Sequence, residues 1–316
     1  MTRARKWVAV DFGGPEVLRC IDVDVPDPGS GQLTIDVRAC GLNPADAKHI
    51  APGQDPKLLP LPIGYEVAGV VAALGPGTRL ASGGGAAGDE VVASQVTGGY
   101  TTAITVPASS AFAKPSTLSF AEGASLLVVA TTAADLLHVS GARQGETVLL
   151  HGAAGAVGLM VLQQARGLGV RVIGTASGPN FGYVRRFGGT PVEYGPGLLD
   201  RVRAAAPEGI AAALDTVGSD EAGDVSLALV SDRSRVVTIA AAPRAKADGY
   251  VFVGASNPQS GPFRARARGR MLELAQNGEL VVPMAQTFAF EDAPAALAML
   301  TSRHAPGKLA LVNQGR

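Results

Sequence analysis

The chain of 316 residues has little cysteine, few aromatic side chains and no net charge, and each shortage excludes a class of protein. Its two cysteines, Cys20 and Cys40, both fall in expected strands, so we expect buried reduced thiols rather than a disulfide framework. Aromatic residues make up 5% of the chain, which argues against a surface that recognises nucleic acid by stacking. Lys+Arg and Asp+Glu are both 27, so no excess of positive charge attracts nucleic acid or an anionic membrane.

Long hydrophobic runs are also missing, although hydrophobic residues make up 47% of the chain. No run reaches the length of a membrane-spanning helix. The N-terminal stretch MTRARKWVAVDF is basic but lacks the apolar core of a signal peptide. We therefore expect a soluble, cytoplasmic protein that binds neither nucleic acid nor membranes and is long enough for two domains.

Glycine, by contrast, is abundant, and one glycine-rich stretch carries most of the information: Thr147 to Gly158, TVLLHGAAGAVG. Its first residues are typical of a strand buried in a parallel sheet, and Ala153, Gly155 and Gly158 follow with the spacing A-x-G-x-x-G. A helix over 159–168 and a strand over 170–176 come next. Small residues here allow a sharp turn and a close approach to a pyrophosphate, which the free N–H groups of the helix start can hold. The stretch predicts a dinucleotide site; a strand-to-helix turn without a ligand is the alternative.

The pattern of strands and helices changes near Pro115. Before it, short strands broken by proline and glycine predict an irregular antiparallel β domain, with strands expected at 6–11, 17–23, 32–39, 67–74, 89–96 and 100–106. After it, a helix over 120–139 capped by Ser119 leads into an alternation that predicts a doubly wound parallel sheet of six strands, expected at 147–152, 171–176, 191–194, 212–217, 235–240 and 250–255. The last elements do not extend this alternation, so we expect the C-terminal segment to return to the first domain.

Several stretches in order resemble the zinc-free quinone oxidoreductases, the zeta-crystallin-like branch of the medium-chain dehydrogenase/reductase superfamily. They are VDFGGPEVLRC, ACGLNPADAKH, PLPIGYEVAGVVAALG, HGAAGAVG, LDTVG and HAPGKLALV, and they extend over nearly the whole chain. The resemblance implies a GroES-like catalytic domain, residues 1–117 and 256–316, interrupted by a Rossmann NADPH-binding domain, residues 118–255. It also implies a cleft between the two and a dimer or a tetramer, of which we expect a homodimer.

The resemblance also bears on metal binding. Asn43 stands where zinc-bearing relatives have a cysteine, and Tyr65 where they have a histidine. Glu66 remains, but one carboxylate without Cys or His cannot hold a catalytic zinc, and the four-cysteine lobe of the structural zinc is missing. We expect no metal, with Glu66 as a structural acid.

The resemblance assigns the cofactor contacts residue by residue. It places Asn43 and Asp46 near the nicotinamide ribose and Thr132 beside the nicotinamide. Asn180 is explained equally well as a helix N-cap. Thr132 is alternatively explained by a hydrogen bond that its hydroxyl forms at a helix start. The remaining contacts follow the glycine turn and the later strand ends: Gly155, Ala156, Val157, Gly158, Ser177, Asn180, Tyr194, Val217, Ala240, Phe252 and Val253.

The segment after the second Rossmann strand favours NADPH over NADH. An NAD-binding domain has an acid about twenty residues past the glycine turn, but TASGPNFGYVRR has none, and the first carboxylate beyond it is Glu193. Ser177 and the helix start near Asn180 offer donors to a 2′-phosphate. Arg185 and Arg186 add positive charge nearby, or form a solvated helix face.

These residues predict an NADPH-dependent reductase that passes a hydride to a quinone or another conjugated carbonyl, polarised by Asn43 and by backbone N–H groups near Thr132. Two alternatives stay open: a reductase of the C=C bond of an enoyl thioester or a biosynthetic intermediate, and a non-catalytic NADPH-binding protein. No catalytic residue stands out. His49, Lys48 and Tyr65 are candidate proton donors, but each is also explained as an ordinary surface or cleft residue, and water can supply the proton.

Overall fold

The computed structural model describes residues 2–254, 257–302 and 306–313, and these form two compact units. The first unit comprises residues 1–128, 272–278 and 282–316, and the second comprises 129–271 and 279–281. Residues 118–128 therefore group with the first unit and residues 257–271 with the second, which differs from the domain boundaries expected from the sequence. Each unit is described by itself below.

The first unit is built on two β-sheets. A small sheet has the order β2-β1-β4, and a larger one the order β15-β16-β3-β5-β6-β8, with β7 also paired to β3. The pairing is antiparallel except between β15 and β16. The strands are β1 (Thr2–Ala9), β2 (Leu18–Val25), β3 (Gln32–Gly41), β4 (Leu61–Pro62), β5 (Glu66–Leu74), β6 (Glu90–Ser94), β7 (Ala103–Pro107), β8 (Ala111–Ala113), β15 (Met284–Ala289) and β16 (Lys308–Val312).

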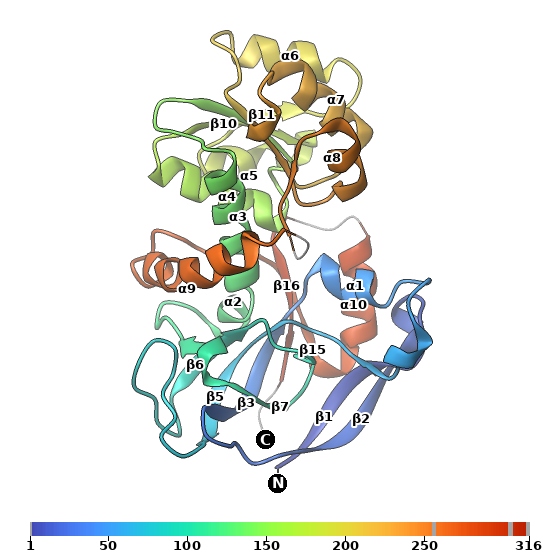
Figure 1. The fold of residues 1–316 in the computed structure, drawn as a ribbon, viewed down its shortest axis with the longest axis vertical. Helices are drawn as coiled ribbons and strands as arrows, with labels where there is room; N and C mark the ends of the chain where they lie inside the picture. The colour runs from blue at the N-terminus through green and yellow to red at the C-terminus, as the bar shows by residue number, and fades with distance from the viewer. Residues whose placement is uncertain (1, 255–256, 303–305, 314–316) are drawn as a thin grey trace. The chain divides into compact units, whose positions relative to one another are not determined.

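The C-terminal strand joins the N-terminal part of the chain in this unit. β16 pairs with β3, with Leu311 opposite Cys40, and both side chains are fully buried. The helices of this unit are α1 (Pro44–His49), α2 (Phe120–Gly123) and α10 (Ala293–Thr301), and α1 and α10 lie side by side (Figure 1). Both cysteines are free, but Cys20 is exposed, so the expectation of two buried thiols is wrong for Cys20. Its strand, β2, lies at the edge of the small sheet, and most of its side chains face outward.

The second unit is a Rossmann fold, as predicted. Its six strands are all parallel and have the order β11-β10-β9-β12-β13-β14. The strands are β9 (Thr147–His151), β10 (Arg171–Ala176), β11 (Thr190–Glu193), β12 (Ala212–Asp215), β13 (Val236–Thr238) and β14 (Val251–Phe252). The helices that belong mainly to this unit are α3 (Leu127–Val139), α4 (Ala156–Gly167), α5 (Phe181–Arg186), α6 (Leu198–Ala205), α7 (Asp220–Leu229), α8 (Ala242–Asp248) and α9 (Ser260–Gln276). Residues 127–128 of α3 and 272–276 of α9 group with the first unit.

Two predicted elements differ from the structure. The single helix expected over 120–139 is two helices, α2 and α3, with a break at 124–126. Ser119 caps α2 as predicted, accepting a hydrogen bond from the N–H of Glu122. The break gives α3 a start of its own, where the N–H of Val128 donates to the Glu66 carboxylate at 3.1 Å. The second difference is α8, a helix that lies between the last two Rossmann strands and was not expected from the sequence.

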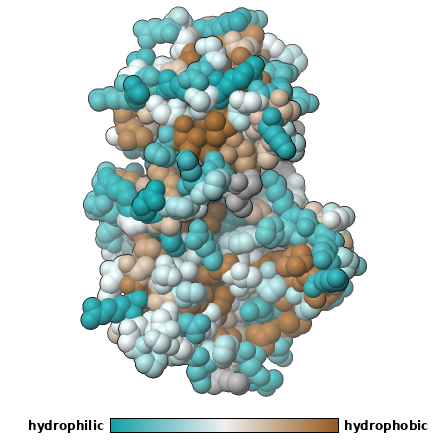
Figure 2. Space-filling model, viewed as in Figure 1, coloured by the Kyte–Doolittle hydropathy of each residue, from teal (hydrophilic) through white to brown (hydrophobic). Residues whose placement is uncertain are grey.

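The surface is mixed in polarity. On the face drawn in Figure 2, hydrophobic residues occur in groups separated by hydrophilic ones. Among the residues that the structure describes, no helix combines the length and the apolar character needed to cross a membrane.

Candidate functional site

The second unit presents the predicted nucleotide-binding residues along one edge of its sheet. Because all six strands are parallel, their carboxyl ends lie at the same edge. The strand order places β9 next to β12, at the switch point where open α/β sheets bind ligands. The predicted residues that lie at these strand ends or within a short turn of them are Gly155, Ala156, Val157, Gly158, Ser177, Asn180, Tyr194, Val217, Ala240, Phe252 and Val253.

The three glycines that follow β9 have different structural roles. Gly152 has φ +77°, a backbone conformation that favours glycine. A Cβ built on Gly158 would lie 2.3 Å from the carbonyl oxygen of Gly152, so glycine here lets α4 pack closely against the turn. A Cβ built on Gly155 would meet that same oxygen at 3.3 Å and otherwise open space. Gly155 is the N-cap of α4, so a pyrophosphate fits the space beside it, next to free N–H groups.

A buried carboxylate shapes the turn after β12. Asp215 is 3% exposed, and its Oδ1 accepts hydrogen bonds from the N–H groups of Val217 at 2.8 Å and Gly218 at 2.9 Å. Its Oδ2 accepts from Thr238 Oγ1, at the end of β13, at 2.7 Å. The turn held in this way leaves the Val217 side chain 54% exposed at the sheet edge. An exposed apolar side chain at this place suits contact with a ligand.

The end of β9 is tied to the same turn. Thr216 Oγ1 donates to the carbonyl oxygen of His151 at 2.8 Å. The His151 ring is buried, and its Nε2 lies 3.1 Å from Ser226 Oγ. Burial lowers the pKa of His151 to about 4, against the opposing effect of nearby carboxylates, so the ring is neutral at physiological pH. The two strand ends at the switch point are therefore held together by hydrogen bonds of the protein itself.

The turn after β10 holds the residues expected at a 2′-phosphate. Ser177 is half-buried, and its Oγ accepts from Asn180 Nδ2 at 3.1 Å. Sequence reasoning missed Glu193 as a neighbour of this turn. Because β10 and β11 pair with Ala176 opposite Glu193, a Cβ built on Gly178 would lie 3.8 Å from Glu193 Oε1. A carboxylate therefore lies close to the Ser177 turn, although none lies near it in the sequence.

Arg185 and Arg186, the candidate positive charges, lie on exposed positions of α5. The Arg185 guanidinium lies 5.6 Å from the centre of the Phe181 ring. The Arg186 guanidinium lies 5.4 Å from the centre of the Phe187 ring. Both arginines therefore pack on aromatic rings of their own segment. This agrees with the alternative that they form a solvated helix face.

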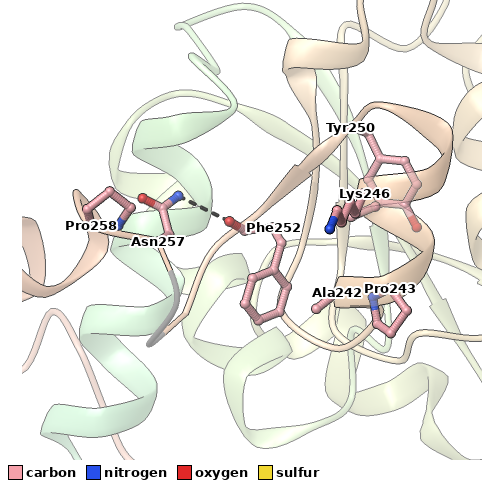
Figure 3. Close-up of a pocket in the computed structure, with 8 residues that line it drawn as sticks. Ala242, Pro243, Lys246, Tyr250, Phe252, Asn257 and Pro258 are labelled. Atoms are coloured by element: carbon pink, nitrogen blue, oxygen red, sulfur yellow. Dashed lines mark hydrogen bonds between the residues drawn. The ribbon is translucent and has the colours of Figure 1, made fainter.

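A pocket of about 590 Å³ opens beside the edge strand β14 (Figure 3). Phe252, the last residue of β14, projects into it, and its carbonyl oxygen accepts from Asn257 Nδ2 at 3.1 Å. The neighbouring Val253 is 1% exposed, so its side chain is not available to a ligand. The pocket is lined by Ala242, Pro243, Ala245, Lys246, Tyr250, Phe252, Asn257 and Pro258.

Thr132 does not lie at a helix start. It is in the second turn of α3 and is 6% exposed. Backbone N–H groups at this depth in a helix are bonded to carbonyl groups one turn earlier. The N–H groups of Thr132 and of the residues that follow it are therefore bonded within the helix and cannot polarise an acceptor.

In the first unit, Asn43 belongs to a buried polar cluster. Lys308 Nζ donates to the carbonyl oxygen of Leu42 at 2.6 Å, to Asn43 Oδ1 at 2.8 Å and to Glu66 Oε1 at 2.9 Å. Asn43 Nδ2 also donates to Glu66 Oε1 at 2.9 Å. Asn43, Glu66 and Lys308 are each at most 3% exposed. Glu66 is thus the structural acid that we expected, and Lys308 is the partner that sequence reasoning missed.

Asp46 extends this cluster. Its Oδ2 accepts from the N–H of Asn43 and from the Tyr100 hydroxyl, both at 2.8 Å, and Asp46 and Tyr100 are fully buried. Burial raises the pKa of Asp46 to about 7, although these hydrogen bonds and the charge of Lys308 oppose the shift. A carboxylic acid with this pKa is present in both its protonated and its ionised form near neutral pH. Enzymes use shifted pKa values of this kind at reactive sites.

The three candidate proton donors behave differently in the structure. Tyr65, just before β5, is half-buried, and His49, the last residue of α1, is exposed. The Tyr65 hydroxyl forms a hydrogen bond with His49 Nδ1, and the two rings meet edge to face with centres 5.3 Å apart. Lys48 is also exposed. The structure therefore brings two of the three candidates into direct contact.

Comparison with known proteins agrees with this arrangement. The model of the alcohol dehydrogenase GroES-like domain matches residues 29–116, and that of the zinc-binding dehydrogenase matches residues 192–311. The synaptic vesicle membrane protein VAT-1 homolog of Mus musculus is 38% identical over 225 residues, 69% of this chain and 54% of that protein. The quinone oxidoreductase of Rattus norvegicus is 42% identical over 171 residues, 52% of this chain and 50% of that protein. The chain thus spans about half the length of the curated relatives it matches.

A solved mycobacterial structure complexed with NADPH is similar over almost the full length. It is 30% identical, covers 98% of this chain and 99% of its own, and has a TM-score of 0.84. The GroES-like and Rossmann parts together define a medium-chain dehydrogenase/reductase. Within that superfamily, the chain belongs to the family of the quinone oxidoreductases, because a solved mycobacterial quinone oxidoreductase is 31% identical over 98% of this chain and 99% of its own, with a TM-score of 0.79.

One family model is named for zinc, but the residues here do not fit that ion. The resemblance places Asn43 and Tyr65 where zinc-bearing relatives have a cysteine and a histidine, and Glu66 is bonded to the buried Lys308 ammonium. A zinc ion would have to displace this cation from the only anionic side chain among the three positions. Within the described ranges, no three His, Cys, Asp or Glu side chains lie close enough together to share a metal ion.

Proposed function

We propose that this chain is an NADPH-dependent reductase that passes a hydride to a quinone or another conjugated carbonyl without zinc. The observation that carries the proposal is the open space at Gly155, at the start of α4 and at the switch point of the parallel sheet. The bound nicotinamide would supply the hydride, and the chain would supply binding, orientation and the exclusion of water. The names of the quinone oxidoreductase relatives and the NADPH complex of the mycobacterial relative support the acceptor and the cofactor.

Each unit contributes its own residues to this function. In the second unit, the start of α4 would bind the pyrophosphate, and Ser177 would donate to a 2′-phosphate. In the first unit, Asn43 and Asp46 would lie near the nicotinamide ribose, as the resemblance implies. The pairing of Lys308 with Glu66 supports a reaction without zinc, because the cation already neutralises the carboxylate. The homodimer remains a prediction from the resemblance, and light scattering in solution would measure the mass. The cytoplasmic location remains a prediction from the composition of the chain.

The preference for NADPH is expected to be modest. A hydrogen bond to a charged group contributes about 1.5–3 kcal/mol, which corresponds to a preference of about ten- to a hundredfold. The Glu193 carboxylate near Gly178 opposes a phosphate, so we expect a ratio of kcat/KM for NADPH over NADH near the low end, about tenfold.

The test is the oxidation of NADPH and of NADH by the purified chain with a panel of quinones, enones and enoyl thioesters. We expect turnover with quinones or enones, unaffected by chelators. Turnover with enoyl thioesters alone would replace the proposal with an enoyl reductase. Cofactor binding without turnover across the panel would leave a binding protein, and a preference for NADH would reject the assignment of Ser177.

A further inference from the structure

The hydrogen bond between Tyr65 and His49 lies at the exposed end of helix α1, in the first unit. Helix α1 carries Asn43 at its N-cap, Asp46 in its first turn and His49 at its end. Residues three apart on a helix lie on neighbouring parts of one face. Here the contacts confirm it, because Asn43 bonds to Glu66 and His49 bonds to Tyr65, the residue just before Glu66. The polar groups thus run from the fully buried Asp46 to the exposed His49.

The surroundings of Tyr65 keep its phenol protonated. Burial, and then the negative charge of Asp46, raise the pKa of Tyr65 above its usual value. A phenol that holds its proton at neutral pH is an acid that can transfer it to a stronger base. His49 is exposed, so its ring is accessible to water.

A reduced quinone or enone provides such a base. Once a hydride has been added to the conjugated system, the electron pair rests on the acceptor oxygen, which must take up a proton. We propose that Tyr65 donates this proton and that His49 relays a replacement from water. The proposal rests on the function proposed above and names the group that completes the reduction. Tyr65 would be a catalytic residue and His49 a relay that acts through it.

The proton transfers balance if His49 carries its hydrogen on Nδ1. In that tautomer His49 Nδ1–H donates to the Tyr65 oxygen, which leaves the phenolic hydrogen free for the acceptor. The Tyr65 O–H bond then breaks as the O–H bond of the product forms. The resulting phenolate takes the Nδ1 proton of His49, and His49 Nε2 takes a proton from water. One hydride and one proton have been added to the acceptor, and the pair needs only a tautomer exchange to return to its starting state.

The activity test compares Tyr65→Phe, His49→Gln and the double variant with the wild type, with a quinone or an enone as the acceptor. We expect Tyr65→Phe to lower kcat about a hundredfold, with an unchanged KM for NADPH, because general acids contribute about 10²–10⁴-fold. His49→Gln should lower kcat about tenfold by the same reasoning, because water then has to reprotonate the phenolate directly. The double variant should resemble Tyr65→Phe alone, since the two residues act in series. The solvent isotope effect on kcat should change in Tyr65→Phe, which a purely structural role would not cause.

A second measurement needs no cofactor and no turnover. Nitrogen NMR of the four histidines in the labelled, cofactor-free chain reports the tautomer of His49, whose signal His49→Gln identifies. We expect the Nδ1–H form in the wild type and the Nε2–H form in Tyr65→Phe. The Nε2–H form in the wild type would overturn the relay even if the chain proved to be an active reductase. If the wild type reduces no acceptor, the function proposed above fails, while the NMR result still decides whether the pair is arranged as a relay.

Lys48 is the competing candidate for the proton donor, because it lies next to His49 on α1. Lys48→Met should keep wild-type kcat if Tyr65 is the donor. A hundredfold loss in Lys48→Met, with wild-type kcat in a folded Tyr65→Phe, would overturn the proposal. The fluorescence of Trp7, the single tryptophan and a member of the same unit, reports whether each variant is folded.

Discussion

Removal of the Lys308 ammonium tests whether the buried cluster of the first unit is held together by charge. The side chains of Lys308 and Glu66 are 3% and 2% exposed, and their charged atoms are 2.9 Å apart. Lys308→Met keeps a stem of similar length but leaves the Glu66 carboxylate with two donors, Asn43 Nδ2 at 2.9 Å and the N–H of Val128 at 3.1 Å. An uncompensated buried charge costs about 3–5 kcal/mol, so we expect the free energy of unfolding of this unit to fall by that amount.

Glu66→Gln should restore part of the loss, because it removes the uncompensated charge and keeps one oxygen that can accept from Asn43 Nδ2. The restoration is only partial, because the N–H of Val128 bonds to the other carboxylate oxygen and loses its acceptor. The double variant should therefore be more stable than Lys308→Met by about 2 kcal/mol, within the range measured for directly coupled residues. As a control, Arg38→Met removes a pair with Asp36 whose side chains are 30% and 51% exposed, and it should cost at most about 1 kcal/mol.

The assay is urea unfolding followed by the fluorescence of Trp7, whose Nε1 donates to the carbonyl oxygen of Phe290 at 2.9 Å within the same unit. A Lys308→Met chain within 1 kcal/mol of the wild type, taking ~1 kcal/mol as the cost of an exposed pair, would refute the reasoning. Strictly additive effects of the two substitutions would refute it as well, because they would show that the charges do not act on each other.

Four further predictions follow from other parts of the chain. Gly155→Ala should fold normally but bind NADPH at least about tenfold more weakly in a fluorescence titration, and normal affinity in this variant would show that the turn does not hold the cofactor. Gly158→Ala should instead lower the melting temperature, because its Cβ would lie 2.3 Å from a carbonyl oxygen. Ser177→Asp should lower the ratio of kcat/KM for NADPH over NADH and Glu193→Gln should raise it, and an unchanged ratio in both would exclude this turn from cofactor choice. His151 has a pKa of about 4 in the folded chain against 6.5 in the unfolded chain, so its contribution to stability is complete above pH 6.5 and falls by about 3 kcal/mol as the pH drops to 4. The urea midpoint of the wild type should therefore decline over this pH range more than that of His151→Gln. Parallel declines would contradict a buried, neutral His151 ring. Purified chain should contain no stoichiometric zinc and keep its activity with chelators, and a zinc ion whose removal abolishes turnover would contradict the assignment of Asn43, Tyr65 and Glu66.

The Rossmann unit was largely predictable from local sequence. The apolar run before Gly152 and the spacing from Ala153 to Gly158 specify a strand, a turn and a helix start, and the structure places each of them there. This works because the pattern of a buried parallel strand and the geometry of a phosphate turn are both set by residues close together in the chain. The helix expected over 120–139 fails for the opposite reason, since the start of α3 is satisfied by Glu66, more than sixty residues away in sequence.

The candidate site depends on contacts between distant residues, and here the sequence was less informative. Lys308 lies 242 positions from Glu66, and no local pattern links the two. Glu193 approaches the Ser177 turn because β10 and β11 pair in parallel, so a position judged remote by counting residues is a spatial neighbour. His49 and Tyr65 were both recognised as candidates, but each alone looks like an ordinary residue, and only their hydrogen bond indicates a shared role.

The bond from Thr216 to the His151 carbonyl has a consequence for how a dinucleotide binds. Because that bond and those of Asp215 already fix the turns after β9 and β12, the turns at which we propose that the dinucleotide binds are ordered without it. Ordering an interface on binding costs about 0.5–1.5 kcal/mol for each immobilised side chain, and a preorganised edge avoids much of this cost. Under the proposed function, the cofactor would therefore bind to this edge with little further ordering of the chain.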